Sequence, residues 1–412
     1  MKNFRRQIEN QKHLKRRYMM DNLQQMVFVL GFMAFWVNGD NYAAAPLLIN
    51  VARDLQIEIS KAGLSVTAYM LAFGLLTIVF GPLGDRYGKT NVIKIVAFGT
   101  AIFSMLGAFA NNLQNLIIIR AINGAFAAGI LPVSVALVGE SSEMSQRQNM
   151  IGKVMGMMFL GGVSATVIGG FLTYFGSWRF VYAVYGVAEL LLALAMLKVL
   201  EKSPQKAAVV SFTKVYKEAL SNRPLVGMVG TMFLIGFSVF GSFTYTGKFV
   251  QSVSNYNILL VGLILSVFGI GTVVGGRKSG AIRKRLGQNF FLVLGIAGGL
   301  AVGTLAMTQS LVLIMIALFV FGLCFIVFQS TLVTTAQETL PKLRGTVMSL
   351  ASFNMVTGGA AGTLIHGQIL QHYGIETIYL VSAILFLTVG VITHTKVRQK
   401  HPLKGIIAEV GS

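Results

Sequence analysis

The chain has 412 residues, of which 54% are hydrophobic and only 12% are charged, and its mean hydropathy is +0.71. Soluble domains carry about twice that share of charged residues, so the composition excludes an ordinary soluble protein and indicates a chain embedded in a bilayer. The formal net charge of +20 suggests nucleic-acid binding only if the basic residues form a continuous stripe.

Twelve apolar segments follow one another along the chain. A helix needs about 20 apolar residues to cross about 30 Å of hydrocarbon. We therefore predict an all-α membrane protein with twelve transmembrane helices, at residues 26–50, 62–82, 91–111, 113–138, 149–172, 179–198, 224–246, 256–276, 289–309, 311–334, 346–370 and 375–395.

The basic residues are distributed unevenly between the two sides of these spans. The outer loops hold only Arg53, Lys61, Arg179 and Lys248, and Arg120 lies within a span; every other Lys and Arg falls on the side of the N-terminus. Positive charge collects on the cytoplasmic side of membrane proteins, so both termini are expected in the cytoplasm. The basic residues make short loops, which argues against a nucleic-acid partner.

The longest polar connection divides the chain near its middle. We predict a basic cytoplasmic tail at 1–25 without a cleavable signal peptide, a six-helix bundle at 26–198, a cytoplasmic linker with an amphipathic helix at 199–223, a second six-helix bundle at 224–395, and a cytoplasmic tail at 396–412. Residues recur across the linker at offsets of 197 to 199, namely Gly81 and Gly88 with Gly280 and Gly287, Gly124 and Glu140 with Gly322 and Glu338, and Arg147 and Gly170 with Arg344 and Gly367. This duplication predicts two facing bundles with a substrate site between them.

The first span carries an acidic residue in an apolar setting. Phe32, Trp36 and Asp40 share one helical face, and Tyr42 is expected to point to the other side. Ionisable residues inside a membrane span usually serve a function.

The connection after the second span reads Gly81-Pro82-Leu83-Gly84-Asp85-Arg86-Tyr87-Gly88-Lys89-Thr90. We expect a loop whose glycines allow a tight turn and a close approach of helix ends. The segment resembles motif A of the major facilitator superfamily, and it recurs in altered form at 280–287. Asp85 is expected to act as a conformational latch on the positive N-terminal end of the eleventh span, with a solvated loop acid as the alternative. The second copy has Lys284 at the equivalent position, so gating should depend more on the first copy.

The fourth span contains Arg120, Asn123 and Gly124, which resemble motif B of the same superfamily. A buried guanidinium is costly in lipid unless it faces a carboxylate or a wet cavity. Asp40 lies at a similar depth and is the expected partner. Desolvation favours the protonated carboxyl and Arg120 favours the charged one, as a proton carrier requires. A static ion pair is the alternative.

Two further spans carry candidate residues. The fifth span has Gly162, Gly169 and Gly170, which are similar to motif C of proton-driven antiporters, although Ala165-Thr166 replaces its Gly-Pro pair. Glu189 in the sixth span is a second candidate for proton coupling, in a span that the resemblance assigns mainly to the outer scaffold. The alternative is that Glu189 contributes only to helix packing.

Aromatic side chains recur at helical spacing in spans that the resemblance places around the cavity. The candidates for contact with an apolar or cationic guest are Phe32, Trp36, Phe240, Tyr245, Phe325 and Gln329. Each stripe alone is more often a matter of helix packing or lipid contact.

The overall resemblance is to twelve-span drug/proton antiporters and their sugar-efflux and siderophore-efflux relatives. It implies a monomeric, multi-pass protein of the plasma membrane that exports drug-like, amphipathic or cationic molecules in exchange for protons. The altered motif C leaves proton-coupled uptake or efflux of a sugar, siderophore or other metabolite open, and a non-transporting sensor or lipid-handling protein remains a third reading. No phosphate-binding Gly-x4-Gly-Lys-Ser/Thr motif, enzyme chemistry or metal-ligand cluster is visible, so we expect the proton gradient to supply the energy without a cofactor.

Overall fold

The computed structural model describes residues 2–201, 212–340 and 343–400, and this part of the chain contains helices and no strands. The helices are α1 (Lys2–Asp54), α2 (Ile59–Tyr87), α3 (Lys89–Gly107), α4 (Leu113–Ala127), α5 (Ile130–Ser141), α6 (Met144–Phe175), α7 (Trp178–Val199), α8 (Phe212–Ser221), α9 (Arg223–Ser254), α10 (Ile258–Leu286), the 3-10 turn η1 (Gly287–Asn289), α11 (Phe290–Met307), α12 (Leu311–Thr339), α13 (Arg344–Tyr373) and α14 (Ile375–Lys400).

The predicted twelve-helix membrane fold is confirmed. Nine described segments are long and apolar enough to cross a bilayer, and one of them, Ile258–Met307, contains both α10 and α11. Helices α4 and α5 together make one span, Leu113–Ser141. The two remaining spans are α1 and α13, which polar residues make less apolar, and which pack inside the bundle against α6 and α9 respectively.

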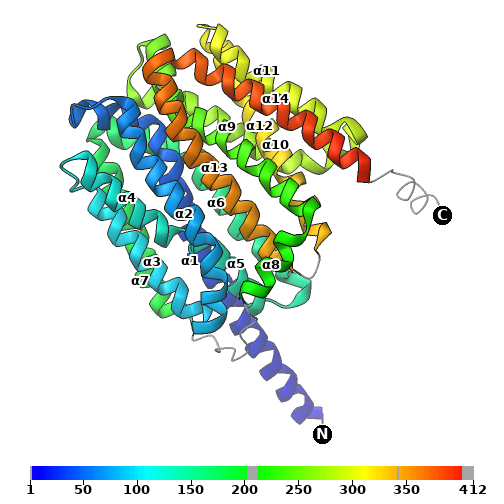
Figure 1. Ribbon diagram of the computed structural model, residues 1–412. Helices are drawn as coiled ribbons and strands as arrows, with labels where there is room; N and C mark the ends of the chain where they lie inside the picture. The colour runs from blue at the N-terminus through cyan, green and yellow to red at the C-terminus, as the bar shows by residue number, and fades with distance from the viewer. Residues whose placement is uncertain (1, 202–211, 341–342, 401–412) are drawn as a thin grey trace.

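Figure 1 shows two groups of helices, α1–α7 and α9–α14, joined through α8. Within the first group α1 packs against α6 and α7, α2 against α4, and α3 against α7; within the second, α9 packs against α13, α10 against α12, and α11 against α14. The halves meet where α2 contacts α13, α6 contacts α10, and α1 contacts α9. The first two contacts are equivalent under the predicted six-plus-six repeat, because α2 corresponds to α10 and α6 to α13.

Residues 81–90 do not form the loop that the sequence predicts. Helix α2 continues through Pro82 to Tyr87, and the chain turns only at Gly88, whose φ of 86° lies in the left-handed region. The second copy of motif A has the same structure: α10 continues to Leu286, and the chain turns at Gly287, whose φ is 51°. Gly81 has no atom within 4 Å of an added Cβ, so the expected close approach is wrong at that position.

Backbones of the two halves approach each other at glycines of α6 and α10. A Cβ added at Gly262 would lie 2.2 Å from the Thr166 carbonyl oxygen, and one added at Gly170 would lie 2.7 Å from the Ile258 carbonyl oxygen. These glycines let the helices cross with no side chain between them. The contact lies in the part of the bundle distant from the start of α1.

The same faces separate toward the opposite end of the bundle. Gly156 and Gly152 continue the stripe of α6 that holds Gly170 at helical spacing, yet both are exposed and an added Cβ would meet nothing within 4 Å. Gly280 near the end of α10 is exposed with the same free space. Helices α6 and α10 therefore touch at one end and diverge toward the end where α1 begins.

Helix α8 follows the linker residues 202–211, which lie outside the described part together with the predicted position of Lys206. Its Tyr216 hydroxyl donates to the Ile78 carbonyl oxygen of α2 at 3.4 Å and also bonds the side chain of Ser349 on α13. Burial raises the pKa of Tyr216 above its usual value, so the hydroxyl keeps its proton. One linker side chain therefore connects both halves where they diverge.

Helix α1 includes the segment expected as a separate tail, since it runs unbroken for 53 residues. At 1.5 Å per residue this helix is about 80 Å long, well beyond the roughly 30 Å of a hydrocarbon core. Its first turns project from the bundle (Figure 1). At its other end, Asp54 pairs with Arg179 at the start of α7, and this hydrogen bond holds the pKa of Asp54 below its usual value.

Candidate functional site

The structure brings Asp40 of α1 and Arg120 of α4 together inside the first bundle. An Arg120 Nη1 hydrogen donates to Asp40 Oδ2 at 2.5 Å, and each side chain is 2% exposed. Charge-assisted hydrogen bonds of this kind are short and strong in a low-dielectric interior. Each ion is the reason that the other can be buried, because an unpaired charge at this depth carries a large desolvation cost.

Aromatic rings enclose the guanidinium group. The Arg120 Cζ atom lies 4.2 Å from the ring centroid of Tyr69 and 5.2 Å from that of Tyr182. Tyr69 can lie so close because its helix packs directly on Gly124, where an added Cβ would be 2.2 Å from the Tyr69 carbonyl oxygen. Asn123 donates from Nδ2 to the Thr100 carbonyl oxygen at 3.1 Å. The motif B residues therefore build the site jointly, with Gly124 admitting α2 and Asn123 fastening α4 to α3.

Several polar atoms of this site have no hydrogen-bond partner among the described residues. They are Asp40 Oδ1, Arg120 Nε and Nη2, Asn123 Oδ1, the Tyr185 hydroxyl, and Glu189 Oε1. Buried polar atoms in proteins are almost always satisfied, so such a concentration sets this region apart from the rest of the core as the candidate site.

Glu189 of α7 belongs to the same buried region. Its side chain is 0% exposed, and its Oε2 accepts one hydrogen bond from Thr100 Oγ1 at 3.3 Å. The face of α7 that carries Glu189 also carries Tyr182 and Tyr185, at steps of three and four residues. The resemblance assigned this span mainly to the outer scaffold, whereas this face of α7 points into the bundle.

The buried charges are confined to one half of the molecule. Among the described residues, the buried charged side chains are Asp40, Lys89, Arg120 and Glu189, all in the first bundle. The buried polar residues of the second bundle are Ser, Thr and His366, and its α9 and α14 exchange hydrogen bonds between Ser238 and Ser382.

Tyr42 points away from the ion pair, as the sequence analysis expected, and contacts the second half of the molecule. Its ring centroid lies 6.0 Å from that of Phe240 and 6.1 Å from that of Phe243, both on α9. Tyr42 is two residues after Asp40 on the same helix, so α1 contributes both to the charged site and to the interface between the halves.

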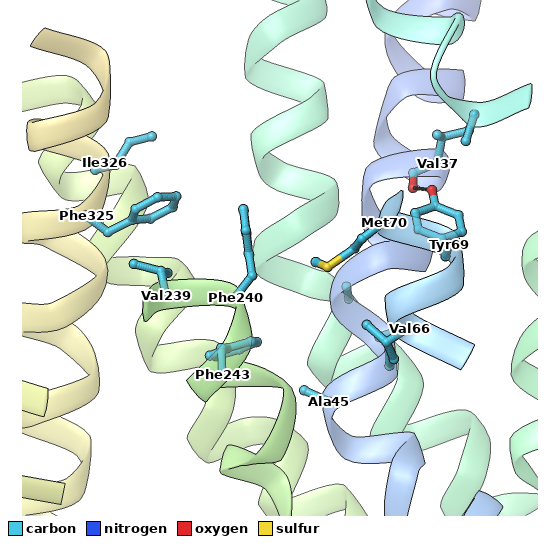
Figure 2. Close-up of a cluster of buried hydrophobic side chains, with 14 of the residues drawn as sticks. Val37, Ala45, Val66, Tyr69, Met70, Val239, Phe240, Phe243, Phe325 and Ile326 are labelled. Atoms are coloured by element: carbon cyan, nitrogen blue, oxygen red, sulfur yellow. Dashed lines mark hydrogen bonds between the residues drawn. The ribbon is translucent and has the colours of Figure 1, made fainter. Parts of the chain in front are cut away.

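The candidate cavity aromatics are more enclosed than expected. Phe240, Tyr245 and Phe325 are 6%, 1% and 2% exposed, and Phe240 packs on Phe325 at 5.7 Å between centroids. Figure 2 shows Met70 extending toward Phe240 of the other half, whereas Tyr69 points away from Phe240 and toward the Val37 carbonyl oxygen. Tyr245 donates to the Thr363 carbonyl oxygen at 2.8 Å. In this state these side chains close the interface instead of lining open space.

The remaining candidates for contact with a guest are Trp36, Phe32 and Gln329. Trp36 packs edge-on against Tyr185 at 5.0 Å and so borders the charged region. Phe32, between Phe28 and Phe35, is half-buried, as is Gln329. A pocket of about 370 Å³ lies instead at the closed end, lined by Ile49, Ile59, Lys248, Gln251, Ser252 and Asn255.

The motif A residues lie beside the turn at Gly88. Lys89 pairs with Glu140 of α5 at 3.0 Å, and Gly84 lies against Lys89 and Val133. Arg86 is exposed beside the ring of Tyr87. The Asp85 side chain lies outside the described part of the structure, so its predicted contact with the start of α13 stays a prediction.

The motif C-like glycines lie where α6 packs on α1 and α10. An added Cβ at Gly162 would be 2.8 Å from Asn38 Nδ2, and one at Gly169 would be 3.4 Å from Ala43. Gly170 instead faces α10 across the interface. Sequence reasoning missed Gly161, whose added Cβ would be 2.0 Å from the Phe35 carbonyl oxygen, and Gly262, which meets α6 from the other half.

Comparisons with known proteins agree with this architecture. The chain is similar to the uncharacterized MFS-type transporter YceJ of Bacillus subtilis, with 26% identity covering 86% of this chain and 91% of the relative, and to a probable sugar efflux transporter of Helicobacter pylori, with 25% identity covering 88% and 92%. Its fold is similar to that of the nucleoside transporter NupG, with a TM-score of 0.75 and 14% identity over 92% of this chain and 99% of that one. It is also similar to a bacterial homologue of the lysosomal transporter Spinster in an inward-facing, unoccupied conformation, with a TM-score of 0.73 and 15% identity over 92% and 97%. The family profile described as Major Facilitator Superfamily matches residues 28–363, and the chain is therefore a membrane transporter belonging to that superfamily.

Proposed function

We propose that the protein exports small amphipathic or cationic molecules from the cell in exchange for protons, with Asp40 as the proton-binding group. The observation that carries the proposal is the fully buried ion pair between Asp40 and Arg120. Protonation of Asp40 removes the charge that stabilises Arg120, so the pair has two states of different packing, as coupling to a proton gradient requires.

The position of the pair connects protonation to movement. Asp40 lies on α1 two residues before Tyr42, which packs against Phe240 and Phe243 of the other half. Loss of the ion pair releases α1 from α4 and so alters one of the contacts between the halves, that of α1 with α9. Alternate opening of the two ends would then follow the protonation state of Asp40.

Export is proposed because the chain resembles efflux transporters, including the probable sugar efflux transporter of Helicobacter pylori. With both termini in the cytoplasm, the separated ends of α6 and α10 would face the cytoplasm, where an exported molecule enters. Half-buried aromatic side chains such as Phe32 and Phe35 lie on α1 toward that end and offer flat apolar surfaces to an amphipathic or cationic guest. A monomer contains every residue that the proposal uses.

Efflux of a sugar is the second candidate. Its support is the likeness over most of the chain to the probable sugar efflux transporter of Helicobacter pylori. A sugar needs hydroxyl and amide partners, and Asn38 and Gln329 are half-buried amide residues; Asn38 Nδ2 donates to the Met158 carbonyl oxygen in the present state, which leaves its Oδ1 to accept from a guest.

The test is transport into inside-out vesicles under an imposed pH gradient, with a fluorescent lipophilic cation and a radiolabelled hexose as probes. The wild type should accumulate one of them only when the vesicle interior is acidic. The variant Asp40→Asn should lose this accumulation and keep exchange of the probe at equal pH, because its side chain cannot carry a proton. Full gradient-driven accumulation by Asp40→Asn would exclude Asp40 as the proton site.

A further inference from the structure

Glu189 is a buried carboxyl group that the ion pair leaves without a counterion. It is 0% exposed, and among the described residues no basic side chain lies within ion-pair distance of it. Its one hydrogen bond comes from Thr100 at 3.3 Å, and Oε1 has no partner. A lone carboxylate is too costly in such surroundings, so Glu189 holds its proton while Asp40 is ionised.

Arg120 has hydrogen-bonding capacity that Asp40 does not use. Its Nη1 group is paired, whereas Nε and Nη2 are buried without partners. Arginine stays charged in proteins, so it requires one carboxylate at all times in this interior. If Asp40 takes up a proton, Glu189 is the other carboxyl group within electrostatic range of Arg120.

A hydroxyl group on α7 lies within electrostatic range of both acids. Tyr185 precedes Glu189 by one helical turn, and a Cβ added at Gly39, the neighbour of Asp40, would lie 3.2 Å from the Tyr185 hydroxyl oxygen. That hydroxyl has no hydrogen-bond partner in the described structure, although it is buried. It can accept a proton on one side and donate its own on the other.

We propose that Glu189 is the second proton position of the Asp40 site, so that one proton is shared by two carboxyl groups and Arg120 pairs with whichever is ionised. In one state Asp40 is the carboxylate and Glu189 carries the proton. In the other the O–H bond of Glu189 has broken, an O–H bond has formed on Asp40, and the Tyr185 hydroxyl or a water molecule has passed the proton on. The charge of the three residues is zero in both states, which the low-dielectric interior demands.

The groups that face Glu189 from the helices around it support a closed set of this kind. They are Thr100 on α3, which donates to Glu189, and Asp40 on α1, Arg120 on α4, Tyr69 on α2 and Tyr185 on its own helix, which lie within electrostatic range of it. Of these, only Asp40 and Arg120 are charged near neutral pH. The inference rests on the proposed proton coupling at Asp40, and it adds the place where that proton is held when Asp40 is ionised.

The test is infrared difference spectroscopy of the purified full chain in lipid, without substrate, in the stretching band of protonated carboxyl groups. The wild type should show one such band at neutral pH, and Glu189→Gln should remove it. Asp40→Asn should remove the same band although Glu189 is still present, because Glu189 then gives up its proton to serve Arg120. Arg120→Gln should have the opposite effect and add a second band, since neither acid then has a counterion.

A Glu189 that merely packs would keep its proton, and its band, in Asp40→Asn, and that result would overturn the proposal. The absence of the band in the wild type would do so as well. The exposed Glu58→Gln is the matched control and should leave the spectrum unchanged. Because the measurement contains no substrate, a failure of the shared proton is distinct from a failure of proton-driven export, which the vesicle experiment tests.

Discussion

At the scale of single residues, the stability of the site depends on mutual compensation between Asp40 and Arg120. Each side chain is 2% exposed, and the guanidinium is enclosed by Tyr69 and Tyr182. Removing Asp40 leaves Arg120 to pair with Glu189, which is not within ion-pair distance of it in this state, and removing Arg120 leaves two buried acids without a counterion. Breaking a buried ion pair in this way typically costs about 3–5 kcal/mol. Removing both leaves no charge to compensate.

This compensation predicts that the effects of the two single substitutions on the free energy of unfolding are strongly non-additive. Asp40→Asn and Arg120→Gln should each lower the free energy of unfolding by about 3 kcal/mol or more, and the double variant should be destabilised by less than the sum of the two. Thermal unfolding in one detergent measures all three, with Glu58→Gln as an exposed control. Additive effects would show that the two charges are stabilised independently.

At the scale of helices, glycines determine how closely neighbouring elements approach. Gly170 and Gly262 bring the backbones of α6 and α10 into contact across the two halves, whereas Gly152 lies on the same stripe of α6 beyond the contact. The same residue type therefore has different roles along one helix.

Gly170→Ala should therefore push the halves apart at their closed end. An added Cβ would lie 2.7 Å from the Ile258 carbonyl oxygen, a backbone atom that cannot move alone. Paired cysteines across that end should cross-link several times more slowly in this variant. Gly152→Ala meets no atom within 4 Å and should leave cross-linking unchanged while stabilising its helix by about 0.5–1 kcal/mol. Equal cross-linking of the two variants would argue against the glycine contact.

A second prediction at this scale concerns the two copies of motif A. Asp85→Asn should slow the exchange between the two open states more than Lys284→Gln does, because only the first copy carries an acid that can meet a helix N-terminus. Transport rates of matched amounts of protein measure the difference. Equal slowing of both variants would remove the asymmetry.

At the scale of the whole molecule, the distribution of basic residues predicts the orientation of the protein in the membrane. The basic residues concentrate at the end of the bundle where the chain begins, so that end should face the cytoplasm. A single cysteine at Ser254 should react with an impermeant reagent in intact cells, and one at Lys206 should react only after the membrane is opened. Labelling of position 206 from outside would reverse the topology and, with it, the proposed direction of transport.

The sequence could predict the features that depend on composition and spacing. Apolar length marked the spans, and the rarity of intramembrane charge singled out Asp40, Arg120 and Glu189. It could not predict contacts made across the two halves, such as Tyr42 on Phe240, because these depend on how two bundles are set against each other. It also misjudged 81–87 as a loop, because Gly and Pro are helix breakers in water but are tolerated in a membrane helix whose neighbours satisfy the backbone.

The confinement of the buried charges to the first bundle has an evolutionary consequence. Substitutions in the second bundle can reshape the surface offered to a guest without disturbing the ionisable residues that would use the proton gradient. Selection for a new cargo can therefore act on one half while the other keeps the same source of energy. Chimeras that join residues 1–201 of this chain to the second half of a relative offer a direct way to follow that route in the laboratory.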